Sequence, residues 1–317
     1  MAAQHELHAS PETVHWGYFD ASLPPTLKVD SGDRVTIHAV TAEPDDLPPE
    51  GFEVLPELLK IHAKGKQVTL MDVGPHFMTG PVWVNGAEPG DTLEVRILDC
   101  TLREDWGWNI ILPLLGTLPE DFPLIRRIHI PLDRKAMTAQ PPWGGTLPLS
   151  PFFGIMGVAP PAAYGQITSS IPREFGGNMD NKELVAGTTL YLPVWNEGAL
   201  FSAGDGHAVQ GDGEVCLTAI EASLSGTFEL IVRKDLSLKF PRAESPTHYI
   251  TMGMNEDLDD AAKQALREMI ALVGEVAGLS PEDGYTLCSL AADLRVTQLV
   301  DGNKGIHAML DKAVLPS

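Results

Sequence analysis

The residues with the clearest chemical potential lie in a glycine-rich stretch of the chain, residues 204–214. Asp205 and His207 stand two positions apart there, and on an extended segment this spacing places both side chains on one side. A carboxylate oxygen and an imidazole nitrogen together suit Zn²⁺, Mn²⁺ or Fe²⁺, whereas an all-oxygen set would suit Ca²⁺ or Mg²⁺. We therefore predict a divalent metal site at Asp205 and His207, completed by Asp180 or Glu214, with Zn²⁺ favoured and Ca²⁺ as the alternative.

The same glycine-rich stretch has a second interpretation. Gly-Asp-Gly units often form hairpin turns in which the aspartate side chain bonds its own backbone. A histidine, two aspartates and a glutamate within residues 205–214 favour the metal site over simple turns. An EF-hand loop is excluded, because its sixth position, counted from Asp205, holds Gln210 where glycine is required.

Two further polar stretches, residues 172–183 and 195–198, adjoin strand-like sequence. Arg173 and Glu174, with the glycines and amides that follow them, could offer charge and hydrogen-bond donors to a small polar ligand. The alternative is a tight turn with an exposed ion pair worth under about 1 kcal/mol. His76, bracketed by two Gly-Pro pairs, is a further binding candidate, although a lone histidine of this kind is more often a core residue.

A β framework must bring these stretches together. Alternating apolar residues predict strands within residues 12–40 and 81–100, and three more within TTLYLPVW, EVCLTAIEA and TFELIVRK. Near the C-terminus, a 3.6-residue period predicts a helix capped by Asn255 and ending near Gly278, and Ser280 followed by proline marks a second helix start. The sequence thus predicts a mainly β fold, with a β-sandwich or barrel-like body and a smaller α/β C-terminal part.

The same patterns divide the chain into three predicted units. Residues 1–150 form an N-terminal β-rich domain, residues 151–247 a central β domain that carries the polar clusters, and residues 248–317 an α/β C-terminal subdomain.

Charge and composition limit the partners and the compartment. Among 317 residues, 43 are acidic and 22 basic, giving a net charge of −21 that repels both phosphate backbones and anionic membranes. We therefore expect neither nucleic acid nor a membrane as a partner. No apolar run reaches the roughly 18 residues of a membrane span, and the first residues lack the basic and apolar regions of a signal peptide. Three dispersed cysteines form no disulfide framework, so we expect a cytoplasmic protein.

Several common catalytic motifs are absent from the sequence, namely GxSxG, GxxxxGK[ST], HExxH and a GxGxxG after a strand. Metal-independent alternatives stay open: Cys216 near Glu214 suggests glutamate–cysteine chemistry, and Lys182 could serve a lysine-assisted amidase. A further alternative is a non-catalytic β-sandwich module whose Gly-Asp loops hold structural Ca²⁺.

Taken together, the polar stretches and their surroundings resemble the acetamidase/formamidase family. The resemblance covers nearly the whole chain, in order. It implies a hydrolase that cleaves the carbon–nitrogen bond of short linear amides to a carboxylate and ammonia, a divalent metal, and a homo-oligomer with a dimer favoured. The matching segments are HWGYFDASLPPTLKVDSGD (15–33), VGPHFMTGPVWVNGAEPGDTLEVRI (73–97), FFGIMGVAPP (152–161), IPREFGGNMDNKELVAGTTLYLPVWNEGALFSAGDGHAVQGDGEVCLTAIE (171–221) and RVTQLVDGNKGIHAML (295–310).

The chemistry of amide hydrolysis suggests a role for each candidate residue. The reaction needs an activated water, a stabilised oxyanion and a proton for the departing amine. An ion at the predicted metal site could lower the pKa of its water to about 7, with Glu197 or Glu174 as general base and then acid. The remaining candidates are Asn178 with the amides of Gly176, Gly177 or Gly206 at the oxyanion, Trp195 and Phe153 as walls of a small pocket, and His76 as a substrate contact.

Overall fold

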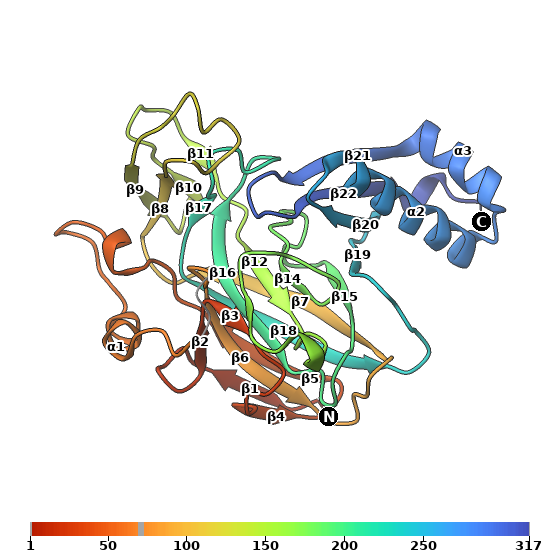
Figure 1. The fold of residues 1–317 in the computed structure, drawn as a ribbon, viewed down its shortest axis with the longest axis horizontal. Helices are drawn as coiled ribbons and strands as arrows, with labels where there is room; N and C mark the ends of the chain where they lie inside the picture. Colours follow the sequence, from red (N-terminus) through yellow and green to blue (C-terminus); the bar gives the residue numbers. More distant parts are fainter. Residues whose placement is uncertain (1, 69–72, 317) are drawn as a thin grey trace.

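The computed structural model describes residues 2–68 and 73–316, and in these ranges the chain is mainly β. Two large sheets make up the body, and two helices pack on the C-terminal strands (Figure 1). The predicted fold class, a β body with a small α/β C-terminal part, is therefore confirmed. No helix in the described ranges has both the length and the apolar character needed to cross a membrane.

The first sheet has nine strands in the order β1-β5-β18-β7-β15-β19-β20-β22-β21. Side chains of β5 and β18 alternate between buried and less buried positions, as expected for strands with one face in the core. The strands are β1 (Gln4–Leu7), β5 (Asp33–His38), β18 (Leu224–Arg233), β7 (Thr92–Leu102), β15 (Thr189–Pro193), β19 (Arg242–Glu244), β20 (His248–Asn255), β22 (Lys304–Asp311) and β21 (Ala292–Gln298).

The second sheet has eleven strands, and β16 lies at its centre between β17, β12 and β6. A separate two-stranded sheet pairs β13 (Ile167–Thr168) with β3 (Tyr18–Phe19). The strands of the large sheet are β11 (Leu147–Pro148), β10 (Thr138–Ala139), β9 (Arg126–Asp133), β8 (Trp106–Ile111), β17 (Ile220–Glu221), β16 (Phe201–Val209), β12 (Phe152–Gly157), β14 (Gly176–Asn178), β6 (Phe77–Val84), β2 (Val14–Trp16) and β4 (Leu27–Val29).

Strands from residues 1–150 and 151–247 alternate within both sheets. β18 lies between β5 and β7, and β16 pairs with β6, so the boundary predicted at residue 150 does not separate two cores in the structure. One apolar cluster joins Ile37 of β5, Phe201 of β16 and Phe228 of β18. Strand β16, which carries Asp205 and His207, is therefore paired with β6 from the first third of the chain.

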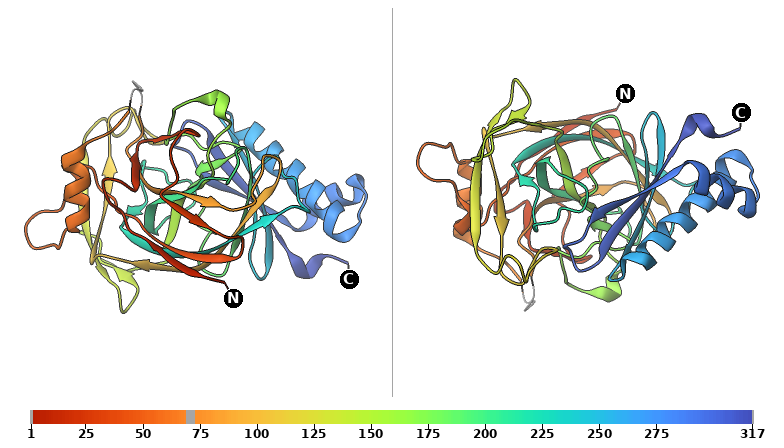
Figure 2. Two further views of the ribbon diagram at one scale, coloured as in Figure 1. Left: turned by 90° about the horizontal axis from the view of Figure 1, so that it is seen from below. Right: turned by 90° about the horizontal axis from the view of Figure 1, so that it is seen from above.

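The C-terminal part places helices on the far end of the nine-stranded sheet, opposite the short helix α1 (Pro56–Lys64) (Figure 2). Ala265, Met269 and Leu272 of α2 (Leu258–Ala277) pack against β22, as the 3.6-residue period predicts. The cap of α2 is Asp257 rather than Asn255, which ends β20 and accepts a hydrogen bond from the Asp257 backbone N–H. Helix α3 (Pro281–Ala291) begins after Ser280, as predicted.

The segment predicted as a strand over EVCLTAIEA is mostly a loop. Only Ile220 and Glu221 are strand, as β17. The backbone of Gly213, Glu214 and Leu217 adopts positive φ angles, which an extended strand does not allow. Short 3₁₀ turns at Pro44–Asp46, Ala162–Tyr164 and Lys312–Val314 complete the described elements.

Candidate active site

A small cavity opens where β16, β17 and β14 meet the loops around them, with a volume of about 60 Å³. A single water molecule needs roughly 10–15 Å³ measured in this way, so the space suits a molecule of a few heavy atoms. One side of the lining is apolar and the other is acidic. The lining residues are Val40, Thr41, Ala42, Glu43, Pro75, His76, Phe77, Trp108, Asn178, Asp180, Asp205, His207, Glu214, Leu217, Thr218, Glu221 and Asp301.

His207 is the centre of the acidic side, and its ring is 1% exposed. Its Nε2 atom lies 3.3 Å from a carboxylate oxygen of Asp205 and 3.3 Å from one of Glu221. Asp180 and Glu214 approach the same nitrogen at 3.7 and 4.0 Å. Four buried carboxyl groups therefore surround one imidazole.

The backbone around this cluster is shaped to let these side chains converge. Asp180, Asp205 and Glu214 adopt left-handed φ values of 47°, 54° and 47°, which are uncommon for residues other than glycine. Such strain concentrates at functional sites, where surrounding structure holds it in place. Loop residue Gly213 pairs with β21 through two backbone hydrogen bonds, Gly213 N to Thr297 O and Leu299 N to Gly213 O, which brings Glu214 close to Asp301.

Hydrogen bonds fix the orientation of several cavity residues. Gln210 Nε2 donates to Glu214 Oε2 at 2.8 Å, and the Ala219 backbone N–H donates to Glu221 Oε1 at 3.0 Å. His76 Nδ1 lies 2.9 Å from Ser169 Oγ. Glu214 is thus held through Oε2 while its Oε1 faces His207, whereas in Glu221 the oxygen that faces His207, Oε1, is itself the one held by the Ala219 N–H.

Burial keeps several of the carboxyl groups protonated. It raises the pKa of Glu214 and of Asp301 well above the usual carboxyl range, and the nearby Asp180 raises both further. Burial likewise raises the pKa of Glu221 to about 8. These groups can therefore carry protons at neutral pH, which an ordinary surface glutamate cannot.

His207 and Asp205 are shifted in the opposite sense, toward their charged forms. Burial opposes charge on His207, but Glu221 and Asp205 outweigh it and raise the pKa of the imidazole well above its usual value. Burial also opposes charge on Asp205, yet His76 and His207 hold the pKa of that carboxyl below its usual range. Perturbed groups of both kinds in one cavity are typical of a functional site.

The donor set fits a divalent cation. Three groups of side chains each offer ligand atoms within 4.8 Å of one another, and Asp180 Oδ1 is buried without a hydrogen-bond partner. A Cβ at Gly154 would lie 2.3 Å from that same oxygen, so only glycine leaves room for the cluster. The groups are Asp180, Asp205 and His207; His207, Glu214 and Glu221; and Asp180, Glu214 and Asp301. The first two combine oxygen with nitrogen, as Zn²⁺ accepts, and the third is all oxygen.

The structure brings together most of the residues predicted around the metal. Asp205 and His207 lie on one strand and share one cluster, as their spacing indicates. Asp180 and Glu214 belong to the same cluster, and Asn178 and His76 line the cavity beside it.

Seven other candidates lie away from the cavity lining. Glu197 is exposed, and Glu174 accepts a hydrogen bond from Tyr164 Oη on the surface. Both residues lie in turns, Glu174 just before β14 and Glu197 after β15, and neither lines the cavity, so the predicted general base is not brought to the cluster. The other five do not line the cavity either: Phe153 packs in the core against Phe228, Trp195 is half-buried, Gly206 faces Ala222 and Leu224, and Gly176 and Gly177 pair with β12.

The lining residues that sequence reasoning did not single out include Glu221, Asp301 and Trp108, which carry the polar groups discussed below. Glu221 had a signal, since it is a lone acid between apolar residues in a predicted strand. Asp301 stands in a turn sequence, DGNKG, that is typical of the surface. Only the pairing of the loop at 213 with β21 places it in the cavity, and this pairing is not visible in local sequence.

The residues of the metal-independent alternatives have other partners. Cys216 contacts the Asn109 side chain, with Asn109 Nδ2 3.2 Å from its Sγ, and does not line the cavity. Lys182 forms an ion pair with Asp212 at 2.7 Å. Neither side chain is placed to act on a molecule in the cavity.

Comparison with known proteins identifies the class to which this fold and site belong. The model of the Acetamidase/Formamidase family matches residues 5–170 and 161–312, so the chain belongs to that family, as the resemblance in its sequence indicates.

Individual relatives agree with this assignment. The formamidase of Methylophilus methylotrophus is 28% identical over 191 residues, covering 44% of this chain and 47% of that protein. The acetamidase of Mycolicibacterium smegmatis is 28% identical over 204 residues, covering 46% and 50%. The chain thus spans about half the length of these curated relatives. The crystal structure of an acetamidase from Bacillus halodurans superposes with a TM-score of 0.82 at 31% identity, covering 96% of this chain and 97% of that one.

Proposed function

We propose that this protein hydrolyses short linear amides to a carboxylate and ammonia in the cavity around His207. The observation that carries the proposal is the convergence of four buried carboxyl groups on one imidazole, beside a cavity that fits only a small molecule. The names of the relatives, formamidase and acetamidase, support the same substrate class.

We further propose that Asp205, His207 and Asp180 hold a divalent ion, with Zn²⁺ favoured, and that Glu214 and Asp301 complete the set. When bound, such an ion supplies Lewis acidity, which acidifies water to a pKa of about 7 and polarises a carbonyl oxygen. Ionised together, the surrounding carboxyl groups would repel one another at high cost in a buried site, and a bound cation would offset that repulsion.

The carboxyl groups whose pKa burial raises would carry out the proton transfer. Hydrolysis forms a carbon–oxygen bond, breaks the carbon–nitrogen bond, and moves a proton from the attacking water to the departing nitrogen. Glu221, whose pKa of about 8 lies near neutrality, can accept and return that proton, and it replaces Glu197 and Glu174 in this role. The hydrogen bond from the Ala219 N–H to Oε1 of Glu221 fixes the carboxyl group with that same oxygen 3.3 Å from His207 Nε2.

Two unpaired polar atoms could recognise the amide group itself. The indole Nε1–H of Trp108 and the Oδ1 atom of Asn178 are buried, lack hydrogen-bond partners, and belong to residues that line the cavity. An amide presents one carbonyl acceptor and one N–H₂ donor, which would satisfy this pair. A buried polar group left unpaired costs about 1–3 kcal/mol, so a ligand lacking either partner binds less well.

Two further proposals concern the oligomeric state of the protein and its location in the cell. Segment 112–147 exposes several large apolar side chains, including Leu114 (85% exposed), Ile125 (67%) and Trp143 (67%). Exposed apolar patches of this kind mark protein contacts, and we propose that a second copy of the chain covers them in a homodimer. The three free, dispersed cysteines support a cytoplasmic location.

The test of the catalytic proposal combines metal analysis with an ammonia-release assay on formamide and acetamide. Exhaustive chelation, Asp205→Ala and His207→Ala should each lower the rate by about 100-fold or more, a typical loss when transition-state electrostatics are removed. Asp212→Ala, an exposed acid in the same loop region, should stay within about twofold. Full activity in both cluster variants would remove the proposal.

A further inference from the structure

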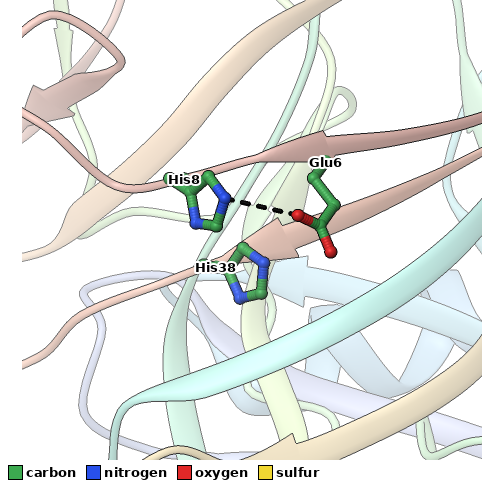
Figure 3. A group of neighbouring side chains, drawn as sticks. All are labelled: Glu6, His8 and His38. Atoms are coloured by element: carbon green, nitrogen blue, oxygen red, sulfur yellow. Dashed lines mark ion pairs between the residues drawn. The ribbon is translucent and has the colours of Figure 1, made fainter.

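A second group of metal-ligating side chains lies at the edge of the nine-stranded sheet, formed by Glu6, His8 and His38 (Figure 3). Each offers one ligand atom within 4.8 Å of the other two. His8 Nε2 lies 3.4 Å from Glu6 Oε2, and the rings of His8 and His38 stack in parallel with centroids 4.5 Å apart. None of the three residues lines the cavity described above.

The pairing of β1 with β5 brings these residues together. The two strands run parallel, with Glu6 opposite Thr36 and Leu7 opposite Ile37. Continuing this register by one residue places His8 beside His38. Side chains alternate along a strand, so Glu6, His8 and His38 share the outer face, while Leu7 and Ile37 are buried on the inner one.

The ring of His38 is fixed through one nitrogen and offers the other to a metal ion. Its Nδ1 atom lies 2.7 Å from Ser225 Oγ on the neighbouring strand β18, which fixes the ring. Its Nε2 atom is buried and has no hydrogen-bond partner. Metal-binding histidines commonly have this arrangement, in which one nitrogen is held by a hydroxyl or carbonyl and the other faces the ion.

His8 and Glu6 are the exposed members of the group. Their side chains are 67% and 68% exposed, so each can turn toward His38 without displacing core residues. Arg103, whose charge acts on His38, is paired with Glu57, and Glu6 places a further negative charge beside the rings of His8 and His38.

The geometry points to a second divalent metal site at Glu6, His8 and His38, distinct from the amidase cavity, that takes Zn²⁺ or a similar transition metal. Two imidazole nitrogens and one carboxylate oxygen form a ligand set that Zn²⁺ uses, with water in the fourth position. The site clamps β1, a four-residue strand at the edge of the sheet, to β5 through side chains rather than backbone alone. It does not depend on the proposed amidase function.

The test uses the tag-free, full chain equilibrated with CoCl₂ or ZnCl₂, with ions counted per chain after dialysis. His8→Ala should bind one ion fewer than the unaltered protein. Ser225→Ala, which frees the ring of His38, should weaken the same ion by about tenfold or more. His248→Ala, a histidine on the distant strand β20, is the matched control and should keep the full count.

Two further measurements keep the result unambiguous. Amide hydrolysis by His8→Ala should equal that of the unaltered protein, which shows that ions at the cavity are unaffected. Zinc should raise the Tm of the unaltered protein more than that of His8→Ala, since an ion that binds only the folded state stabilises it. An equal ion count and an equal zinc-dependent Tm rise in the unaltered protein and His8→Ala would overturn the inference.

Discussion

At the scale of single residues, Gly154 decides whether the acidic side chains can meet. It stands on β12 opposite the Asp205 position of β16, and its φ lies outside the left-handed region, so its backbone does not itself require glycine. The requirement is space. A Cβ there would lie 2.3 Å from Asp180 Oδ1 and 2.6 Å from Asp205 Oδ2, well inside contact distance.

Gly154→Ala should therefore abolish most amide hydrolysis while leaving the fold intact. Moving the two carboxyl groups by even an ångström can cost about 100-fold in rate, and we expect a loss of at least this size together with weaker metal retention. The matched control is Gly274→Ala in α2, where alanine is favourable in the helix and no atom lies closer than 3.5 Å. An active, metal-retaining Gly154→Ala protein would show that the cluster is not the site.

Trp108→Phe tests whether the unpaired indole N–H contacts the substrate. The change keeps an aromatic wall but removes the donor, so kcat/KM for acetamide should fall about tenfold, the equivalent of one hydrogen bond of roughly 1.4 kcal/mol. Trp195→Phe is the matched control, because Trp195 also has an unpaired Nε1–H but does not line the cavity. Equal losses in both variants would argue against a specific contact at Trp108.

At the scale of secondary-structure elements, the turn between β21 and β22 carries Asp301 into the cavity. Gln298 holds this turn: its Oε1 accepts from the backbone N–H groups of Val300 and Asp301, at 2.9 and 3.1 Å. Its Nε2 donates to Asn303 O at 2.7 Å. One buried side chain thus positions a carboxyl group that belongs to a different part of the chain from the other ligands.

Gln298→Ala should loosen the turn and lower both activity and metal affinity, by about tenfold each, an effect comparable to the loss of a supporting hydrogen-bond partner. Titration of the purified variant with Zn²⁺, followed by the ammonia assay at saturating Zn²⁺, separates the two effects. Gln264→Ala is the control, since Gln264 accepts a hydrogen bond from Met254 N between α2 and β20, away from the cavity. A loss of stability alone, equal in both variants, would contradict the positioning role.

The elements also explain which parts of the site were predictable from sequence. The Asp205–His207 pair followed from the alternation of side chains along one strand, which is a local property. The position of Glu174 and Glu197 depended on where each turn leaves the sheet, and their sequence gives no sign of this. Asp301 depended on a contact between segments nearly ninety positions apart, Gly213 with Thr297 and Leu299.

The fold shows the same division between local and long-range information. The predicted helix over α2, where the apolar pattern is long, is correct. The strand predicted over EVCLTAIEA is wrong for most of its length, because positive φ angles at Glu214 and Leu217 interrupt it. The interleaving of β5, β18 and β7 also escaped prediction, since strand order depends on tertiary pairing rather than on alternation.

At the scale of the whole molecule, the folded chain encloses histidines that carry no charge. The ring of His15, on β2, points toward β16. Its Nδ1 is 2.6 Å from Tyr18 O and its Nε2 is 2.9 Å from Ser202 Oγ. Burial lowers the pKa of His15 to about 4, and burial lowers the pKa of His307 to about 4 as well. An unfolded histidine titrates near 6.5. Below that pH the unfolded chain binds protons that the folded chain does not.

The contribution of His15 to the free energy of unfolding should therefore fall by about 3 kcal/mol as the pH drops from about 6.5 to about 4, while the cavity groups with raised pKa values act in the opposite sense. The sign follows from the lowered pKa: above about 6.5 both states are neutral at this residue and no stability is lost, whereas below it protonation favours the unfolded state. Urea unfolding at a series of pH values between 7.5 and 4.5 measures the slope. The free energy of unfolding of His15→Gln should rise by about 3 kcal/mol relative to that of the unaltered protein as the pH falls through this window, because the titrating group is gone. His248→Gln, at a histidine that is only partly buried, serves as the control for removing an imidazole. Parallel pH profiles for the unaltered protein and His15→Gln would show that His15 is not held neutral in the folded molecule.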